Sequence, residues 1–497
     1  MAYYNPDEIA IPNGHFSHGQ LDFPTGHERH AVTRPSDGVV YAEIPIADGP
    51  YVDRVVRASY EAFRSSDWAT RAPRDRAKVL MRWAELVEDN CQYLAQLESV
   101  GSSRTYQDVL QWDIPYVADT IRFFAEIADK DGGYVGTTQS NRFGMVVTEP
   151  YGVVGAITPW NFPMSMAMWK AAPALAAGNA VVMKPSELTP FSTLCLAQLA
   201  IDAGLPNNIF NVVLGTGQVT GAKLCEHPLV SRVTFTGSTQ TGANIMSACA
   251  LTGPKPATLE LGGKSPQIVF ADAPDIELAA SMVAKAITGN AGQVCVSGSR
   301  LIIEQELYEQ FIPLIIAHFK QLIAGHTWEQ DTTLGPIISE QQLSRIESIV
   351  QKSISDGSQC LYGGERIVGQ ECGTYFQPTI LKVTGCDDIA ITQEIFGPVL
   401  TVQTFTSEQE AWQLASHNTY GLAAGVHTSN LDRALRAVRN IEAGSVWINR
   451  YGRTFDHIMP TGGYKCSGIG KDIGKEAFEE NRRSKTVMID FDLHPSN

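Results

Sequence analysis

VVGAITPWNFP, residues 153–163, joins a short run of apolar residues to a polar turn that two prolines stiffen. Such a run is typical of a buried strand, and open α/β sheets bind ligands just beyond their strand ends. The segments between this run and the next ones are long enough for one helix each, as at 169–177 and 192–203. This alternation predicts βαβ units in a parallel sheet, and a set of unrelated buried strands is the alternative. The other short runs lie at 180–183, 209–213, 233–235 and 259–261.

The sequence on either side predicts further helices and a second α/β domain. Apolar residues at helical spacing predict helices at 51–68, 79–97 and 114–128. Two extended segments, 142–148 and 484–491, fit neither sheet, and we expect them to pair and form an oligomer contact. The alternation returns between 271 and 463, with helices expected at 276–286, 306–323, 340–356 and 407–417 and strands at 300–303, 399–405, 424–427 and 445–448.

Composition narrows the class of protein. A chain of 497 residues is too long for one small core, so two or more domains are expected. A formal net charge of −15 repels phosphate backbones and disfavours nucleic-acid binding. No apolar run reaches the roughly 18–20 residues of a membrane span, and the N-terminus lacks a signal-peptide pattern, so we expect a cytoplasmic protein. The nine cysteines are odd in number and include no CxxC pair, which argues against a disulfide scaffold or a metal site.

The turn after residue 157 offers a candidate for oxyanion stabilisation. Asn161 lies between Pro159 and Pro163, so its backbone is expected to be well fixed. A side-chain amide at a strand end can donate a hydrogen bond to a developing oxyanion. The alternative is an asparagine that closes its own turn.

Three further segments at strand ends indicate nucleotide binding. Lys184 and Glu187, in the KPSE segment, can bond ribose hydroxyls, and a carboxylate there would repel a 2′-phosphate, which favours NAD over NADP. A solvated ion pair on a loop is the alternative. Two glycine-rich turns, 215–221 and 235–242, follow strands and offer free N–H groups to phosphates, although most turns of this kind have no ligand.

Cys295 is a candidate nucleophile in the loop GQVCVSG. No basic side chain is adjacent, so activation of the thiol must come from elsewhere in the fold, and an inert core thiol is the alternative. Glu260, in LELGGK, lies among apolar residues, and desolvation would raise its pKa and suit it as a general base. A carboxylate satisfied by backbone N–H groups is the alternative. In EIFGPV, Glu394 can bind the hydroxyls of a ribose while Phe396 packs beside it. The alternative is that this segment is only a loop before a strand.

Taken together and in this order, seven segments closely resemble the aldehyde dehydrogenase superfamily. They run from residue 158 to residue 468 and read TPWNFP, KPSE, FTGST, LELGGK, GQVC, EIFGPV and GGYKCSG. The resemblance implies a homodimer or homotetramer whose bridging strands lie at the interface. It also implies an α/β protomer of three parts, namely a Rossmann-like NAD-binding domain (1–130 and 150–262), an α/β catalytic domain (263–465) and a small β bridging element (131–149 and 479–497).

By motif position, the resemblance implies roles for single residues. Cys295 would be the nucleophile, Asn161 the oxyanion donor and Glu260 the base that activates the deacylating water. Lys170 and Asp472 fall where some members have a proton-relay Lys and Glu, and the Asp is one methylene shorter. The cofactor, NAD with NADP as the alternative, would be held by Thr158, Pro159, Trp160, Lys184, Ser186, Glu187, Gly217, Gly237, Ser238, Gly242, Gly262, Glu394 and Phe396.

The substrate remains open, although the sequence suggests features of its pocket. Residues 450–461, RYGRTFDHIMPT, depart from the family pattern, because Thr461 stands where many members have an aromatic residue. Arg450, Arg453 and His457 are therefore expected at a tunnel mouth, where they would attract a polar or anionic tail. The alternative is that the arginines pair with acids at a subunit interface. An apolar tunnel for a medium-sized aliphatic or aromatic aldehyde is expected from Phe162, Met166, Trp169, Val294, Val296, Phe455 and Trp112, with plain core packing as the alternative.

Two rival functions would use the same fold. A CoA-acylating dehydrogenase would share the cysteine but needs no hydrolytic base, so Glu260 argues against it. A catalytically silent relative should have lost Cys295, Glu260 or Asn161, and all three are present.

Overall fold

The computed structural model describes residues 1–369 and 373–491, and β7 (Val153–Ile157) lies near the centre of its first sheet. The strands from β7 to β11 pair in parallel, which confirms the predicted βαβ sheet and shows that the alternative of unrelated strands is wrong. The short β21 pairs antiparallel with β11 at one edge. In spatial order the sheet contains β2 (Gln20–Asp22), β1 (His15–Ser17), β9 (Phe210–Val212), β8 (Ala180–Lys184), β7, β10 (Val230–Thr236), β11 (Ala257–Glu260) and β21 (Gly468–Ile469).

The strand order reverses beside β7. The chain runs outward from β7 through β8 to β9 and then places β10 on the other side of β7. In this outward half, α6 (Pro163–Ala176) connects β7 to β8, and α7 (Phe191–Asp202) connects β8 to β9. Such a reversal leaves a crevice beyond the carboxyl ends of the two central strands, where open α/β sheets bind ligands. The residues that follow β7 and β10 are therefore placed for a site.

Two helices around this sheet differ from their predicted bounds. The predicted helix at 79–97 is two helices that meet at Asn90, whose side chain donates to the Leu86 carbonyl at 2.8 Å and ends the first of them. The helix predicted at 169–177 begins at Pro163, because a proline fits the first helical position, where no backbone N–H is needed. The other helices of this region are α1 (Gly49–Ser65), α2 (Pro73–Asp89), α3 (Cys91–Gly101), α4 (Tyr106–Asp108), α5 (Ile114–Ile127), α8 (Ala222–Glu226), α9 (Thr239–Leu251) and α16 (Gly474–Glu480).

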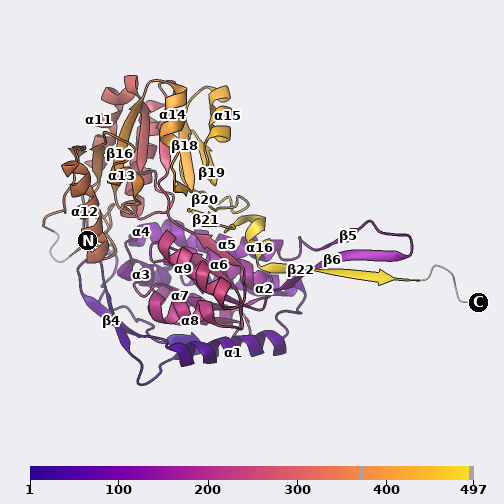
Figure 1. The fold of residues 1–497 in the computed structure, drawn as a ribbon. Coiled ribbons are helices and arrows are strands. Elements are labelled where there is room, and N and C mark those ends of the chain that lie inside the picture. Colours follow the sequence, from indigo (N-terminus) through magenta and orange to yellow (C-terminus); the bar gives the residue numbers. More distant parts are fainter. Residues whose placement is uncertain (370–372, 492–497) are drawn as a thin grey trace, which may run out of the picture.

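The second sheet forms a separate lobe, drawn largely in orange at the top of Figure 1. All neighbouring strands pair in parallel except β14 and β15, so the second α/β unit expected from the sequence is present. Its strands, in spatial order, are β14 (Gln359–Tyr362), β15 (Thr379–Lys382), β16 (Val399–Phe405), β13 (Arg300–Glu304), β12 (Pro266–Val269), β18 (Ala423–His427) and β19 (Ser445–Ile448). Its helices are α10 (Ile276–Thr288), α11 (Tyr308–Phe319), α12 (Glu340–Ser355), α13 (Ile389–Thr392), α14 (Glu408–Ala415) and α15 (Leu431–Asn440).

Some elements of this lobe were not predicted correctly, and β14, β15, α13 and α15 were not predicted at all. The helix expected at 306–323 ends at Phe319, because Ile323 instead bonds Thr333, with its N–H 2.8 Å from the threonine hydroxyl. The central strand β12 was missed, because its four residues begin with a proline and show no alternation. Chain segments at the N-terminus were also not predicted as strands, among them the hairpin of β3 (Arg29–Thr33) and β4 (Val40–Pro45).

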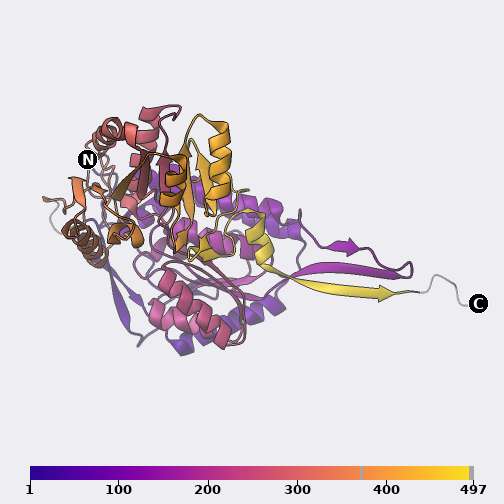
Figure 2. The same ribbon diagram turned by 45° about the horizontal axis from the view of Figure 1, so that its top comes forward.

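A three-stranded ribbon projects from the body of the molecule (Figures 1 and 2). Its central strand β6 (Arg142–Pro150) pairs antiparallel with β22 (Arg482–Asp490) on one side and with β5 (Tyr134–Gly136) on the other. The expected pairing of 142–148 with 484–491 is therefore confirmed, whereas the oligomer contact stays a prediction. Residues 492–497 of the predicted bridging element lie outside the described residues. Within 1–369 and 373–491, no helix combines the length and the apolarity that a membrane span needs.

Candidate active site

Asn161 lies in the crevice, on the turn between β7 and α6. Its buried side-chain amide donates to the carbonyl oxygen of Gln293 at 3.0 Å, which is 132 residues away in the sequence. In return, the side chain of Asn290 donates to the carbonyl oxygen of Asn161 at 2.9 Å. The amide therefore contacts a distant loop rather than closing its own turn. One N–H of the amide is held by this bond, which fixes the direction of the other.

The loop that carries Cys295 is held in an uncommon backbone conformation. Asn290 and Ala291 have positive φ angles of 50° and 52°, which cost roughly 1–2 kcal/mol each for residues with a Cβ. Gly292 has a φ of +73°, and a Cβ there would lie 2.2 Å from the carbonyl carbon of Gly397, so only glycine fits. Gln293 is buried, and both polar atoms of its side-chain amide bond backbone groups. The nitrogen donates to the Pro336 carbonyl at 3.1 Å, and the oxygen accepts from the Ile338 N–H. These contacts fix the position of the thiol.

The Cys295 thiol lies beside a cation that is distant in sequence. Removal from water raises the pKa of Cys295, and the nearby Arg453 guanidinium opposes that rise. Arg453 comes from the loop after β19, and the Cζ of its guanidinium lies 4.5 Å from the centre of the Trp169 ring. The sequence prediction required an activating group from elsewhere in the fold, and this arginine meets the description.

A cavity of about 280 Å³ brings most of the predicted centre together. It contains the thiol, the amide and a wall of small residues from the ends of β10 and β11. Gln342 and Arg345, from α12, line it as well and were not predicted. The predicted residues that line it are Pro159, Trp160, Asn161, Phe162, Met166, Gly237, Ser238, Gly262, Cys295, Glu394 and Phe396.

Glu260 ends β11 with a buried carboxyl group. Its Oε1 has no hydrogen-bond partner among the described residues, so it is not satisfied by backbone N–H groups at that atom. Burial, followed by the nearby Asp472 carboxylate, raises the pKa of Glu260 to about 8. A carboxyl group with this pKa is mostly protonated at neutral pH and can exchange a proton with water at little cost.

Lys170 and Asp472 form a buried ion pair close to Glu260. Lys170 also lies 3.4 Å from the Phe235 carbonyl oxygen, at the end of β10. Burial raises the pKa of Asp472, and Lys170 opposes this. The shorter aspartate still reaches the lysine, and an antiparallel bridge to Thr461 holds the backbone of Asp472.

Glu394 and Phe396 line the cavity next to the segment that follows β11. Glu394 Oε1 accepts a 2.9 Å hydrogen bond from the Gly263 N–H, and its carboxylate fills the space that a Cβ on Gly262 would need. Burial raises the pKa of Glu394. Phe396 has a φ of 57°, and its ring lies edge-on to Trp160 at 5.2 Å. Glu394, Phe396, Trp160 and Gly262 line the same cavity as the thiol, and we call this part of the cavity the slot.

The remaining predicted nucleotide contacts follow the carboxyl edge of the sheet. Lys184, at the end of β8, is buried, and its Nζ lies 3.1 Å from Glu187 Oε2. Burial alone would raise the pKa of Glu187, but Lys184 lowers it overall. Ser186 accepts from the Leu188 N–H within its own turn, and the Thr158 N–H donates to the Lys184 carbonyl.

The two glycine-rich turns differ in their backbone. Gly237 and Ser238 follow β10, and Ser238 caps the N-terminus of α9 by accepting from the Thr241 N–H, while Gly242 is buried in the first turns. Gly217 begins a π-helical turn capped by Thr216 and is exposed. Gly217 and Gly242 do not line the 280 Å³ cavity, whereas Gly237 and Ser238 do.

A second cavity of about 560 Å³ continues outward from the first, and the two share Phe162, Met166 and Arg453. Its wall matches much of the predicted tunnel and includes the aromatic residues Trp112, Tyr116, Phe162, Trp169 and Tyr451. Polar groups also reach it, among them the buried ion pair of Arg104 with Asp113. The predicted residues in its wall are Trp112, Phe162, Met166, Trp169, Val294 and Val296.

Three residues expected at the tunnel mouth lie elsewhere. Arg450 lines neither of these two cavities but an adjacent one, which shares Tyr116, Gly452 and Arg453 with the second, and its guanidinium donates to the Gly452 carbonyl at 3.2 Å. Phe455 is 37% exposed and packs against Trp112, with ring centres 4.7 Å apart, but it is not part of the tunnel wall. His457 is buried against Tyr116. Arg450 precedes Arg453 on the loop after β19, whereas Phe455 and His457 follow it, and the residues of this loop that line the second cavity are Tyr451, Gly452 and Arg453.

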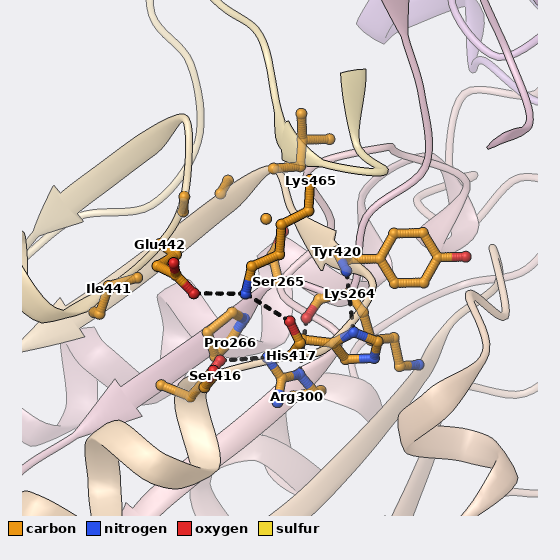
Figure 3. A pocket seen from close by; sticks show the side chains of 15 residues that line it. Lys264, Ser265, Pro266, Arg300, Ser416, His417, Tyr420, Ile441, Glu442 and Lys465 are labelled. Atoms are coloured by element: carbon orange, nitrogen blue, oxygen red, sulfur yellow. Dashed lines mark hydrogen bonds and ion pairs between the residues drawn. The ribbon is translucent and has the colours of Figure 1, made fainter. Parts of the chain in front are cut away.

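A fourth cavity is lined by residues 264–266, which follow β11 (Figure 3). Lys264 and Arg300 are buried in its wall, and Lys465 reaches across it to Glu442 at 2.6 Å. Burial and Arg300 lower the pKa of Lys264 to about 7. The cavity measures only about 20 Å³, which is room for about one water molecule. It is too small for an aldehyde or a nucleotide.

Comparison with known proteins agrees with this geometry. Residues 23–487 match the model of the aldehyde dehydrogenase family. The chain belongs to the aldehyde dehydrogenase family. It is 39% identical, over 99% of both chains, to the NADP/NAD-dependent aldehyde dehydrogenase PuuC of Escherichia coli. As a structure, this aldehyde dehydrogenase matches the P. syringae indole-3-acetaldehyde dehydrogenase AldA in complex with NAD+ and IAA, with a TM-score of 0.96 and 38% identity over 98% of each chain.

A further solved relative is the gamma-glutamyl-gamma-aminobutyraldehyde dehydrogenase of Burkholderia cenocepacia, with a TM-score of 0.95 and 38% identity over 98% of each chain. Two residues of this aldehyde dehydrogenase that hold the site were not predicted. Arg345 donates to the Glu394 and Ile395 carbonyls from α12, and nothing in its local sequence signals these contacts. Gln293 holds the thiol loop and stands in the GQVC segment, which singled out only the cysteine.

Proposed function

We propose that this chain oxidises an aldehyde to a carboxylic acid with NAD, through a covalent thioester on Cys295. One observation carries the proposal. The Cys295 thiol and the Asn161 amide border the same 280 Å³ cavity as Gly262 and Glu394, so nucleophile, oxyanion donor and cofactor slot share one space. This cavity opens into a larger aromatic one that suits the body of an aldehyde.

The residues around the slot suit a nicotinamide dinucleotide. The Glu394 carboxylate and the Lys184–Glu187 pair would bond the two riboses, and the α9 N-terminus at Gly237 and Ser238 would face phosphate oxygens. When bound, NAD supplies an acceptor for hydride. Glu187 would repel a 2′-phosphate, which favours NAD over NADP.

Cys295 and Asn161 perform the first half of the reaction. The thiolate adds to the aldehyde carbon, and Arg453 favours its ionised form. The amide N–H of Asn161 that is not bonded to Gln293 donates to the resulting oxyanion. A preorganised donor of this kind contributes about 10²–10³ to the rate. Collapse of the oxyanion expels hydride and leaves a thioester on Cys295.

Glu260 performs the second half. Its unsatisfied Oε1 accepts a proton from a water molecule, which then attacks the thioester. The adjacent Lys170–Asp472 pair offers an exit for that proton. A CoA-acylating enzyme would need no such base, so the buried carboxyl group supports hydrolysis over transfer to CoA.

A direct assay tests this proposal. Purified protein is mixed with a panel of small aldehydes and either NAD or NADP, and reduced cofactor is followed by absorbance. We expect oxidation that needs both aldehyde and cofactor, is faster with NAD, and yields the carboxylic acid. No reduced cofactor with any aldehyde would contradict the proposal, and formation of product only when CoA is added would favour the acylating alternative.

The pKa of Glu260 leads to a pH prediction. Below a pKa of about 8 the group is mostly protonated and cannot accept a proton from water, so steady-state turnover should rise about tenfold from pH 7 to pH 9 and then level off. The raised pKa of Cys295 acts in the same direction. Steady-state rates measured across this range check it, and a flat or falling profile contradicts the role of Glu260.

We also propose that the chain forms a homodimer or homotetramer through the bridging element, residues 131–149 and 479–497. The projecting ribbon presents exposed apolar side chains on two edge strands, including Val135 at 68% and Met488 at 53% exposure. Light scattering should give two or four times the chain mass. The double substitution Val135→Lys and Met488→Lys should lower that mass, whereas Val368→Lys, an exposed position away from the ribbon, should not. An unchanged mass in the double variant contradicts the proposal.

We propose a cytoplasmic location as well. The eight cysteines that the structure describes are all free thiols, a state that a reducing compartment maintains. Fluorescence microscopy of the tagged chain in its native cells tests this, and an extracellular signal would contradict it.

A further inference from the structure

Arg453 is a partly buried arginine that forms no ion pair with an acidic residue of the described chain. Its Nη2 donates to the Thr461 hydroxyl at 2.7 Å, and its guanidinium stacks on Trp169. No carboxylate of residues 1–369 or 373–491 forms an ion pair with it, whereas the buried Arg104 and Arg232 pair with Asp113 and Glu480. A guanidinium held in place on two sides, with its charge uncompensated, is a preformed receptor for a planar anion.

The charges around Arg453 leave this cation in excess. Lys170 and Asp472 neutralise each other. Glu260 is mostly protonated at neutral pH, because its pKa is raised to about 8. Among Arg453, Lys170, Asp472 and Glu260 this leaves one net positive charge before substrate binds, and an anionic group in the substrate would compensate it.

The position of Arg453 limits how far that anion lies from the reacting carbon. Arg453 borders both the cavity of Cys295 and the outer aromatic cavity, and it shares this boundary with Phe162 and Met166. Because Arg453 lines the same cavity as the Cys295 thiol, an anion bound to this arginine lies near an aldehyde carbon at the thiol, so a short chain joins the two.

We propose that Arg453 binds a carboxylate at the far end of the substrate, so that the preferred substrates are short semialdehydes. This inference rests on the proposed function and deepens it. Thr461 orients the arginine by accepting its hydrogen bond, and the guanidinium packs over the Trp169 ring. Arg450 takes no part, because it lines neither of the two cavities.

The test compares two aldehydes of the same shape. 4-Oxobutanoate carries a carboxylate where 4-methylpentanal carries an isopropyl group, so their kcat/KM ratio isolates the charge. We expect the wild type to prefer the anion by about 100-fold, the loss typical of a charge pair deprived of one partner. Arg453→Met should abolish the preference: kcat/KM for 4-oxobutanoate should fall about 100-fold further than kcat/KM for 4-methylpentanal, whose own fall reflects the lost support of the Cys295 thiolate. Arg453→Lys should keep part of the preference, and Arg450→Met, the matched control, should keep all of it.

The other outcomes overturn the inference in distinguishable ways. A wild type that oxidises both aldehydes equally well shows that Arg453 does not bind the carboxylate of the substrate. An Arg453→Met variant that loses activity on both aldehydes to the same extent shows that the guanidinium serves the thiol rather than the substrate tail. If the wild type oxidises neither of these aldehydes nor any other, the proposed function itself fails, and the inference falls with it.

Discussion

Cys295→Ala is expected to lower aldehyde oxidation by about 10⁴-fold or more, because no other thiol lines the cavity. The methyl group of alanine leaves the loop unstrained, since the backbone bonds of that loop come from Asn290 and Gln293. Formation of NADH from NAD and an aldehyde measures the effect. Binding of NAD should persist, because Glu394 and the α9 N-terminus are untouched.

A matched control separates this effect from general thiol loss. Cys386 is exposed and does not line the cavity, so Cys386→Ala should keep wild-type activity. Equal rates in the wild type and in Cys295→Ala would move the nucleophile to another residue and contradict the mechanism.

Glu260→Gln is expected to release one NADH per subunit in a rapid burst and then stall. Glutamine keeps the shape of the protonated acid but cannot accept a proton, so the thioester forms and is not hydrolysed. The steady-state rate should fall by about 10²–10⁴-fold while the burst survives. Rapid-mixing absorbance of NADH resolves the two phases.

Hydroxylamine provides the control for this variant. It attacks thioesters without the help of a base, so its addition should restart NADH formation in Glu260→Gln. A variant that loses the burst as completely as the steady state would assign Glu260 to an earlier step, and a variant with normal turnover would show that another group activates water.

Local sequence predicted the parts of the fold that depend on local patterns. β16 and β19 have the predicted bounds, because each is rich in the β-branched and aromatic residues that favour strands. β12 was missed, because four residues that begin with proline carry too little periodicity. The break between α2 and α3 depends on one side-chain hydrogen bond from Asn90, which a helical pattern does not reveal.

The site divides in the same way. The candidates Cys295 and Asn161 stand out, because small residues or prolines surround a single reactive side chain. The bond between Asn161 and Gln293 could not be predicted, because it joins segments 132 residues apart. The placement of Arg453 over Trp169, with Arg450 outside both cavities, depends on how one loop turns after β19, and spacing alone leaves the two arginines equivalent.

The most direct test of the central claim is the mass of the stalled intermediate. Glu260→Gln protein is incubated with NAD and an aldehyde, quenched in acid, digested and examined by mass spectrometry. The account predicts that the peptide containing Cys295 gains the mass of the acyl group, in an amount that matches the NADH released. NADH release without any adduct on that peptide, or with the acyl group on a different residue, would contradict it.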